Sequence, residues 1–428
     1  ASLLVLIPRE AAAQCPTFTG GESFTAGITR FQNPNAQMWF NDGLWWGAFS
    51  DFNLGIYFYS MPAGGLSKGP IIDGNILASP DVLWDGTNLH VLVWKSLALA
   101  TFYKYSYNSV AKSYTLLPGF PVNLALTGAS PPAVLEKDST GKLWATYTST
   151  NGGGSDGKVR VIWSTSADHT TWDTTGNILE TGLIPNNMEV ADIVHFGNKI
   201  GVVWSNYPGK QIAFRYHTDG DVETSWSIKE TIDSGNGPSN FPNGSVADDH
   251  LSMAAAPDGR IFLVAKDNDN DGTVANAHVG RLWLYIRTAA GVWGQKTIVQ
   301  PDPSQIPTRP VIALDTTHNV AYVVYHDETL PGRNSTGRNF ITHTLMDNPV
   351  FDFPCVLTIT PSSNPVSTKQ NVTSATGLMV ASSTGQTASN EVVFRGVDLS
   401  INPVPTVTSL APASAVKGGA AFTLTVNG

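Results

Sequence analysis

Charged and polar residues stand directly before strand-like segments at several places in this 428-residue chain. Residues 248–250 read Asp-Asp-His, and Arg309 precedes another such segment. A carboxylate or imidazole near a guanidinium suits β-elimination of an acidic polysaccharide, because the cation stabilises the enolate-like charge that develops while the base removes a proton. The expected catalytic residues are Asp249, His250 and Arg309.

Other polar residues occupy equivalent places and are expected to bind the ligand: Asp81, Asp192, Asp248, Lys369 and Gln370. A structural role is the alternative, because polar side chains at strand entries often satisfy backbone donors, and Arg309 would then pair with Asp249. A glycoside hydrolase needs two carboxylates, one of them protonated, at a separation that the sequence does not reveal.

One acidic loop has the spacing of a calcium site. Asp267, Asp269 and Asp271 precede Gly272, so that alternate carboxylates of a tight loop converge. The twelfth position is His278 instead of a ligating Glu. We expect a structural Ca²⁺ and no other cofactor, with an unliganded acidic loop as the alternative.

The elements that carry these residues form a repeat. A strand, a tight turn with Gly or Asn and a second strand recur every 45 to 61 residues. The second strands begin at Leu44, Leu89, Leu143, Ile200, Ile261, Val320 and Leu378. Four short strands fill each period, which predicts an all-β, seven-bladed β-propeller with four-stranded antiparallel blades. The strand entries would then meet on one face around the central channel.

The ring must close on itself, and Phe24 to Phe31 is the expected closing strand. Cys15 and Cys355, the only cysteines, either form a disulfide near this seam or remain two buried thiols. Trp172, Trp226 and Trp293 precede fourth strands and are expected to pack between neighbouring blades.

Ser166-Ala-Asp168-His-Thr-Thr-Trp172 resembles the Asp-box turn of sialidase-like (BNR) propellers, although it lacks the glycine and is one residue short. The resemblance implies a propeller and, by analogy, carbohydrate. Sialidases also grip a carboxylate with several arginines, whereas here Arg309 alone stands at a strand entry. Sialidase activity is therefore not expected.

From Pro405 onward, the sequence PTVTSLAPASAVKGGAAFTLTVNG resembles the first two strands of an IPT/TIG immunoglobulin-like domain. The expected organisation is a signal-peptide remnant at 1–13, a propeller at 14–400, a linker at 401–405 and a truncated immunoglobulin-like β-sandwich at 406–428. The chain is then a monomeric module of a longer bacterial protein.

The net charge of −9 disfavours nucleic acid and anionic membranes, which need clustered Lys and Arg. The apolar run 1–8 is too short to span a bilayer. We expect a secreted or cell-surface propeller that binds extracellular glycan and cleaves it as a lyase or hydrolase, with whether it is an enzyme left open. A non-catalytic adhesion module that binds a surface protein is the alternative.

Overall fold

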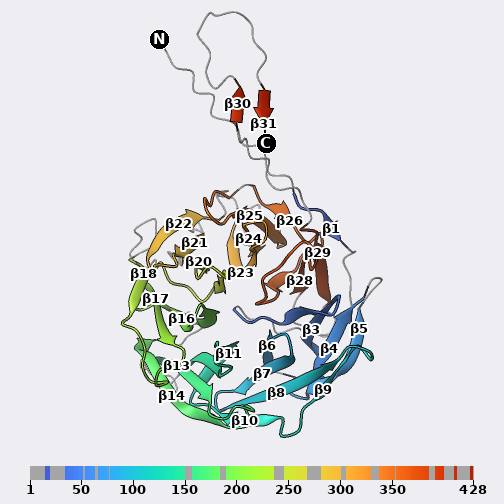
Figure 1. The fold of residues 1–428 in the computed structure, drawn as a ribbon, viewed down its shortest axis with the longest axis vertical. Helices are drawn as coiled ribbons and strands as arrows, with labels where there is room; N and C mark the ends of the chain where they lie inside the picture. The colour runs from blue at the N-terminus through green and yellow to red at the C-terminus, as the bar shows by residue number, and fades with distance from the viewer. Residues whose placement is uncertain are drawn as a thin grey trace, which may run out of the picture.

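The computed structural model describes residues 15–19, 34–51, 54–62, 66–76, 78–149, 157–183, 189–235, 245–267, 281–299, 305–328, 337–351, 353–384, 391–399, 409–411 and 425–427. Seven antiparallel sheets stand around a central axis as the blades of a propeller (Figure 1). No helix occurs among the described residues, and none of them could therefore form a membrane-spanning helix. The predicted fold class is confirmed for the propeller.

The first three blades follow one another in the chain. Blade 1 contains β2 (Met38–Asn41), β3 (Leu44–Asp51), β4 (Gly55–Met61) and β5 (Ser67–Asp73). Blade 2 contains β6 (Ser79–Trp84), β7 (Asn88–Ser96), β8 (Leu99–Asn108), β9 (Ser113–Leu116) and β10 (Val122–Ala125). Blade 3 contains β11 (Ala129–Lys137), β12 (Leu143–Ser149), β13 (Gly157–Ser164) and β14 (Trp172–Leu183).

The next three blades repeat this order from the axis outward. Blade 4 contains β15 (Ala191–Phe196), β16 (Lys199–Asn206), β17 (Gln211–Thr218) and β18 (Glu230–Ser234). Blade 5 contains β19 (Leu251–Ala255), β20 (Ile261–Lys266), β21 (Leu282–Arg287) and β22 (Trp293–Ile298). Blade 6 contains β23 (Pro307–Asp315), β24 (Val320–Asp327), β25 (Asn339–Leu345) and β26 (Cys355–Val356).

Blade 7 joins both ends of the ring. It contains β27 (Ser363–Val366), β28 (Leu378–Ser383), β29 (Val392–Val397) and, as its outermost strand, β1 (Phe18–Thr19). The innermost strand of blade 7 ends at Val366, where the backbone turns toward blade 1: the carbonyl of Ser367 accepts from the N–H of Met38 at 3.1 Å.

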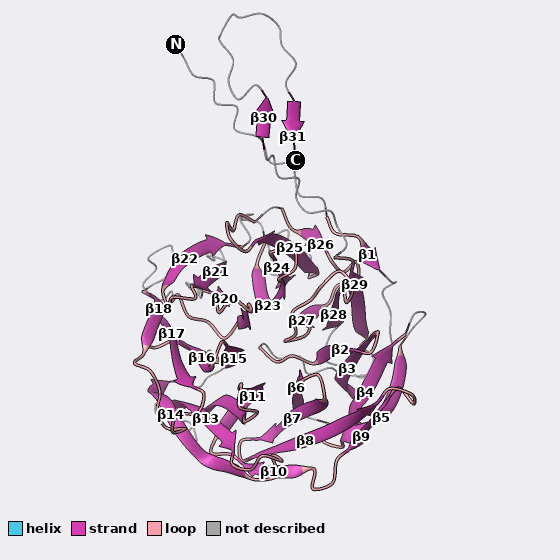
Figure 2. Cartoon of the chain, viewed as in Figure 1, coloured by secondary structure: helices cyan, strands magenta, loops and turns pink. Residues whose placement is uncertain are grey.

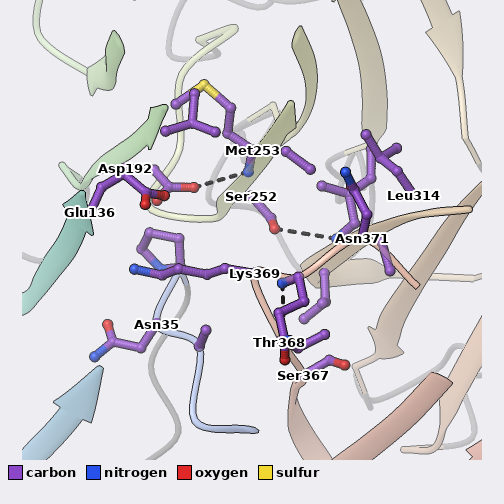
Figure 3. A pocket seen from close by; sticks show the side chains of 18 of the residues that line it. Asn35, Glu136, Asp192, Ser252, Met253, Leu314, Ser367, Thr368, Lys369 and Asn371 are labelled. Atoms are coloured by element: carbon purple, nitrogen blue, oxygen red, sulfur yellow. Dashed lines mark hydrogen bonds between the residues drawn. The ribbon is translucent and has the colours of Figure 1, made fainter. Parts of the chain in front are cut away.

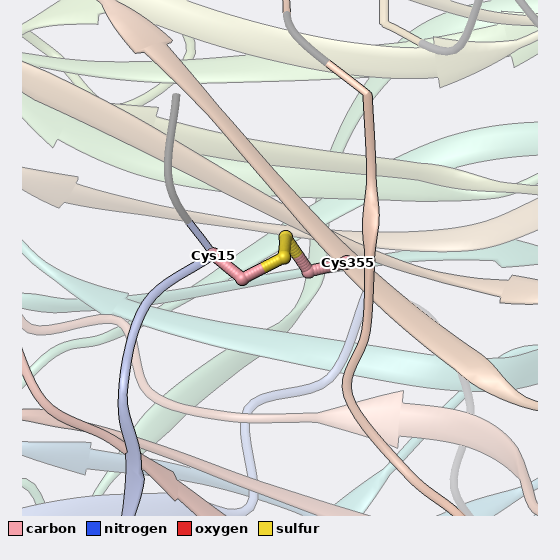
Figure 4. The surroundings of a disulfide bond; sticks show 2 residues. All are labelled: Cys15 and Cys355. Carbon is pink, nitrogen blue, oxygen red and sulfur yellow. A yellow bond between two sulfur atoms is a disulfide. The ribbon is translucent and has the colours of Figure 1, made fainter. Parts of the chain in front are cut away.

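Strand β1 pairs with β29 and closes the ring. The predicted closing strand, Phe24 to Phe31, lies outside the described residues. Gly396 permits the close approach, because a Cβ there would lie 2.3 Å from Oγ1 of Thr19. Cys15, just before β1, forms a disulfide with Cys355 of β26 (Figure 4). The N-terminal segment is thus hydrogen-bonded to blade 7 and covalently joined to blade 6.

Apolar cores lie between neighbouring blades, because a single sheet cannot bury both of its faces. In blades 3, 4 and 5, an aromatic residue near the start of the outer strand packs against the preceding blade. Trp172 contacts Phe102 at 5.3 Å between ring centroids, and Trp293 contacts Phe214 at 5.5 Å. Trp226 packs at 6.0 Å from Trp144, as predicted.

A separate hairpin follows the ring in the chain (Figure 2). It consists of β30 (Ser409–Ala411) and β31 (Thr425–Asn427), which pair antiparallel. The predicted linker at 401–405 lies outside the described residues, as do residues 1–14 and the rest of 406–428. The immunoglobulin-like identity of this part and the domain boundaries stay predictions.

Candidate functional site

The entry of blade 5 carries a compact group of ionisable side chains. Residues 248–250 precede β19, and the N–H of Lys266, at the end of β20, donates to the carbonyl of His250 at 2.9 Å. Nδ1 of His250 lies 2.8 Å from Oδ1 of Asp248 and 2.5 Å from Oδ1 of Asp249. Nζ of Lys266 lies 3.3 Å from Oδ2 of Asp248. We name Asp248, Asp249, His250 and Lys266 the blade-5 cluster.

The side chains of the blade-5 cluster shift one another's pKa values in different directions. Burial and the hydrogen bond with Asp248 raise the pKa of Asp249 to about 6. Burial also acts to raise the pKa of Asp248, but Lys266, Asp249 and His250 hold that pKa well below its usual range. Burial lowers the pKa of His250, and the two carboxylates outweigh this and raise it. The two carboxylates therefore favour the imidazolium form of His250.

The same cluster has the donor set of a metal site, since one ligand atom from each of Asp248, Asp249 and His250 lies within 4.8 Å of the others. Lys266 already supplies a positive charge to Asp248, and its own pKa is raised because the charges of Asp248, Asp249 and Glu328 outweigh burial. The cluster is thus charge-compensated by protein groups alone.

Arg309 of blade 6 lies on the strand next to the blade-5 cluster, in β23. A bulge between Thr308 and Val311 interrupts the pairing of β23 with β24, and Arg309 sits in it with φ 53°. Its side chain is half-buried, and within the described part of the chain it makes no ion pair and no hydrogen bond. The alternative that Arg309 pairs with Asp249 is not observed there.

The electrostatic effect of Arg309 falls on its own blade. Burial, and then the charge of Arg309, lower the pKa of His326 to about 4, so this imidazole is neutral. Glu328, just after β24, acts on both His326 and Lys266. The entries of blades 5 and 6 therefore form one continuous charged region, which we name the entrance site.

The central channel holds a second polar group (Figure 3). Lys369 extends from blade 7, and its Nζ lies 2.5 Å from Oδ2 of the fully buried Asp81 in blade 2 and bonds to the carbonyl of Leu135 in blade 3. Oδ1 of Asp81 accepts from the N–H of Ala36 at 2.8 Å, and Oδ2 accepts from the N–H of Leu135 at 2.7 Å. Both carboxylate oxygens of Asp81 therefore already accept hydrogen bonds.

Two further carboxylates line this channel. Oδ2 of Asp192 accepts from the N–H of Met253 at 2.9 Å, and burial raises the pKa of Asp192 to about 8 although Lys369 opposes the shift. Burial likewise raises the pKa of Glu136. Sequence reasoning missed this residue because it lies within β11 and does not precede a strand. The pocket that these carboxylates and Lys369 line has a volume of about 40 Å³. That is room for water and not for a sugar ring, since a cavity of ~150 Å³ holds one benzene.

Gln370 joins the seam of the ring. Its Oε1 accepts from the N–H of Phe40 at 2.8 Å, and its Nε2 donates to the carbonyl of Phe40 at 3.2 Å. The side chain thus extends the hydrogen bonding of blade 1 into blade 7. Of the predicted site residues, the structure brings Asp248, Asp249 and His250 into contact, and it groups Asp81, Asp192 and Lys369 separately in the channel.

Asp267 of the predicted calcium loop is buried at the end of β20. Its Oδ1 accepts from the N–H of Arg281 at 2.5 Å, and its Oδ2 accepts from Nε1 of Trp283 at 2.7 Å. Asp269 and Asp271 lie outside the described residues. The calcium site stays a prediction.

No family model matches this chain, and no curated protein matches it. Among solved structures, the polysaccharide lyase Uly1 superposes with a TM-score of 0.50 at 10% identity, over 90% of this chain and 94% of that one. An ulvan lyase of family PL25, bound to -[GlcA(1-4)Rha3S]-, superposes with a TM-score of 0.53 at 10% identity, over 88% and 96%. At this identity the likeness shows a shared fold.

Proposed function

We propose that the chain is an exported polysaccharide lyase that binds an acidic polysaccharide at the entrance site and cleaves it by β-elimination. The observation that carries the proposal is the half-buried Arg309 guanidinium, which has no partner anion in the described part of the chain and stands on the strand next to a carboxylate–imidazole cluster. Removing a cation even partly from water without an anion nearby costs free energy, and a uronate carboxylate would compensate the charge. The fold shared with two polysaccharide lyases supports the reaction class by analogy.

In this mechanism Arg309 binds the uronate carboxylate and stabilises the negative charge that develops on it. The carboxylate of Asp249 removes the proton from C5 of the uronate, the C4–O bond breaks, and a C4=C5 double bond forms. The imidazolium of His250 gives a proton to the departing oxygen. Asp248 and Lys266 hold the imidazole in its charged form.

The stereochemistry follows from the contact between the acid and the base. Nδ1 of His250 lies 2.5 Å from Asp249, so both groups meet the same face of the sugar. Elimination on one face requires H5 and O4 on that face, as in 4-linked glucuronate and mannuronate. We therefore expect these uronates to be cleaved, and their C5 epimers to be resistant.

The test is the rise of absorbance from unsaturated uronates, measured with 4-linked glucuronans and mannuronans. His250→Asn and Arg309→Lys should lower kcat/KM by ~10²-fold or more, because the proton donor or the bidentate carboxylate contact is lost. His318→Asn is the matched control: Nδ1 of His318 lies 2.7 Å from Oδ2 of Asp315, but in the turn between β23 and β24, at the opposite end of the innermost strand. Equal losses in both His variants would contradict the assignment.

A hydrolase finds less support, because the channel carboxylates are occupied by backbone N–H groups and by Lys369. New reducing ends without unsaturated products would replace the lyase with a hydrolase. Binding without any product would favour the non-catalytic module, with a surface protein or glycan as its partner. The size of the chain in solution, by light scattering, tests the expected monomer.

Export is supported by the Cys15–Cys355 disulfide, because such bonds persist in oxidising compartments. The Asp-box-like turn is supported by two contacts: Oγ of Ser166 accepts from the N–H of Thr171 at 3.1 Å, and Nε1 of Trp172 donates to the carbonyl of His169 at 3.0 Å.

We keep calcium at residues 267–271 in the proposal. A chelator should lower the unfolding temperature of the wild type and not that of Asp271→Asn.

A further inference from the structure

A cavity of about 140 Å³ opens at the outer rim between blades 1 and 2, away from the central channel. Strands β4 and β5 of blade 1 and the β9 segment of blade 2 border it (Figure 2). Strand β9 exists because the outer edge of blade 2 is divided: β9 pairs with one half of β8, and β10 pairs with the other. The cavity therefore depends on the one blade that departs from four strands.

Three aromatic side chains form the apolar part of its lining. Trp46, Phe58 and Tyr114 all line the cavity and are all buried in the protein core. The rings of Phe58 and Tyr114 stack at 5.5 Å, and Trp46 meets Tyr114 edge-on at 5.1 Å. The aromatic wall is thus fixed by contacts within the protein, so it is preorganised to stack on one face of a ring.

The indole N–H of Trp46 is buried and has no hydrogen-bond partner among the residues that the structure describes. The neighbouring indoles are satisfied: Trp39 donates to the hydroxyl of Tyr114 at 2.7 Å, and Trp45 donates to the carbonyl of Thr376 at 2.9 Å. An unsatisfied buried donor costs free energy, and it identifies the place where a ligand acceptor would fit. Ser60 and Ser113 add hydroxyl groups to the same lining.

The charge at the cavity is balanced. Among the described residues of the lining, Lys112 alone is ionic. It forms an ion pair with Asp42, which also accepts a hydrogen bond from Tyr107 at 3.0 Å. No cation is therefore left to compensate an acidic ligand, in contrast to Arg309 at the entrance site. The occupant that fits is neutral.

We infer that this rim cavity is a second, non-catalytic carbohydrate site that holds one neutral pyranose ring. A cavity of ~150 Å³ accepts a single six-membered ring. One face of the sugar would stack on the aromatic wall, and its hydroxyls would accept from Trp46 and exchange hydrogen bonds with the two serines. The inference goes beyond the lyase proposal and does not depend on it.

The test uses neutral methyl pyranosides of glucose, galactose, xylose and rhamnose, with binding followed by saturation-transfer NMR and calorimetry. A ligand of this size should bind with a millimolar Kd. Trp46→Phe should weaken binding by roughly tenfold, because it removes the donor and part of the wall. Trp45→Phe, the same change in a neighbouring core indole that packs on Phe40 and does not line the cavity, should leave Kd within about twofold.

The double variant Ser60→Ala/Ser113→Ala keeps the aromatic packing and should also weaken binding, so the test survives if Trp46→Phe unfolds. His250→Asn should bind the pyranosides as the wild type does, which separates this site from the entrance site. The inference is overturned if no neutral pyranoside binds, if toluene binds and sugars do not, or if the wild type and the double variant bind equally.

Discussion

Replacing Lys369 with Met should destabilise the ring more than any exposed lysine would. Nζ of Lys369 lies 2.5 Å from Oδ2 of Asp81, whose side chain is fully buried. The change leaves this carboxylate among backbone donors without a compensating cation. Removing one partner of a buried pair costs about 3–5 kcal/mol. At ~2–4 °C per kcal/mol for domains of 150–250 residues, and less for larger ones, the unfolding temperature should fall by ~5–10 °C.

The loss of folding stability in Lys369→Met should depend on pH. Burial raises the pKa of Asp81 above its unfolded value, and the loss of the lysine raises it further. The folded state then binds a proton that the unfolded state has lost, so the added cost grows as pH rises above about 4 and disappears below it. Denaturant unfolding at pH 3.5 and pH 7.5, with ΔG extrapolated to water, measures the difference.

Two variants complete this test. Lys229→Met is the control, because the Lys229–Glu180 pair is more exposed and should contribute less than ~1 kcal/mol. Asp81→Asn combined with Lys369→Met removes both charges and should recover part of the loss, because the amide of Asn can accept from only one of the two backbone N–H groups. If Lys369→Met keeps its stability but loses glycan binding, the stabilising role of the Lys369–Asp81 pair is refuted. Lys369 is then the ligand-binding residue that the sequence predicted.

Three further outcomes are expected. The Asp192 carboxyl keeps its proton to about pH 8 in the fold and loses it near 3.8 when unfolded, so wild-type stability should fall by up to ~1.4 kcal/mol per pH unit between these values, and Asp192→Asn should flatten the curve in pH-dependent denaturation. Cys15→Ser with Cys355→Ser should cost roughly 2–5 kcal/mol in denaturant unfolding, and an unchanged midpoint would show that β1 closes the ring unaided. Lyase activity should rise with pH around 6 as Asp249 ionises, and a profile that is flat from pH 5 to 7 would exclude Asp249 as the base.

The sequence groups Asp248, Asp249 and His250 but does not pair the channel residues, and their positions in the chain explain why. Asp248, Asp249 and His250 are consecutive, so their contact needs little more than a local turn. Asp81 and Lys369 looked equivalent to them as strand-entry residues, yet they meet across 288 positions of sequence and satisfy each other in the channel. Burial, which no single-sequence pattern reports, separates the two groups.

The sequence by itself determined the strands, the turns and the seven blades, because alternating side chains and turn residues act within about fifteen positions of each other. It also determined that Trp172, Trp226 and Trp293 pack between blades, since their place before outer strands repeats. The tertiary structure alone decided the short closing strand β1, the pairing of Cys15 with Cys355 and the cavity beside Trp46. These features depend on ring closure, which brings together residues as many as 340 positions apart after the local pattern has ended.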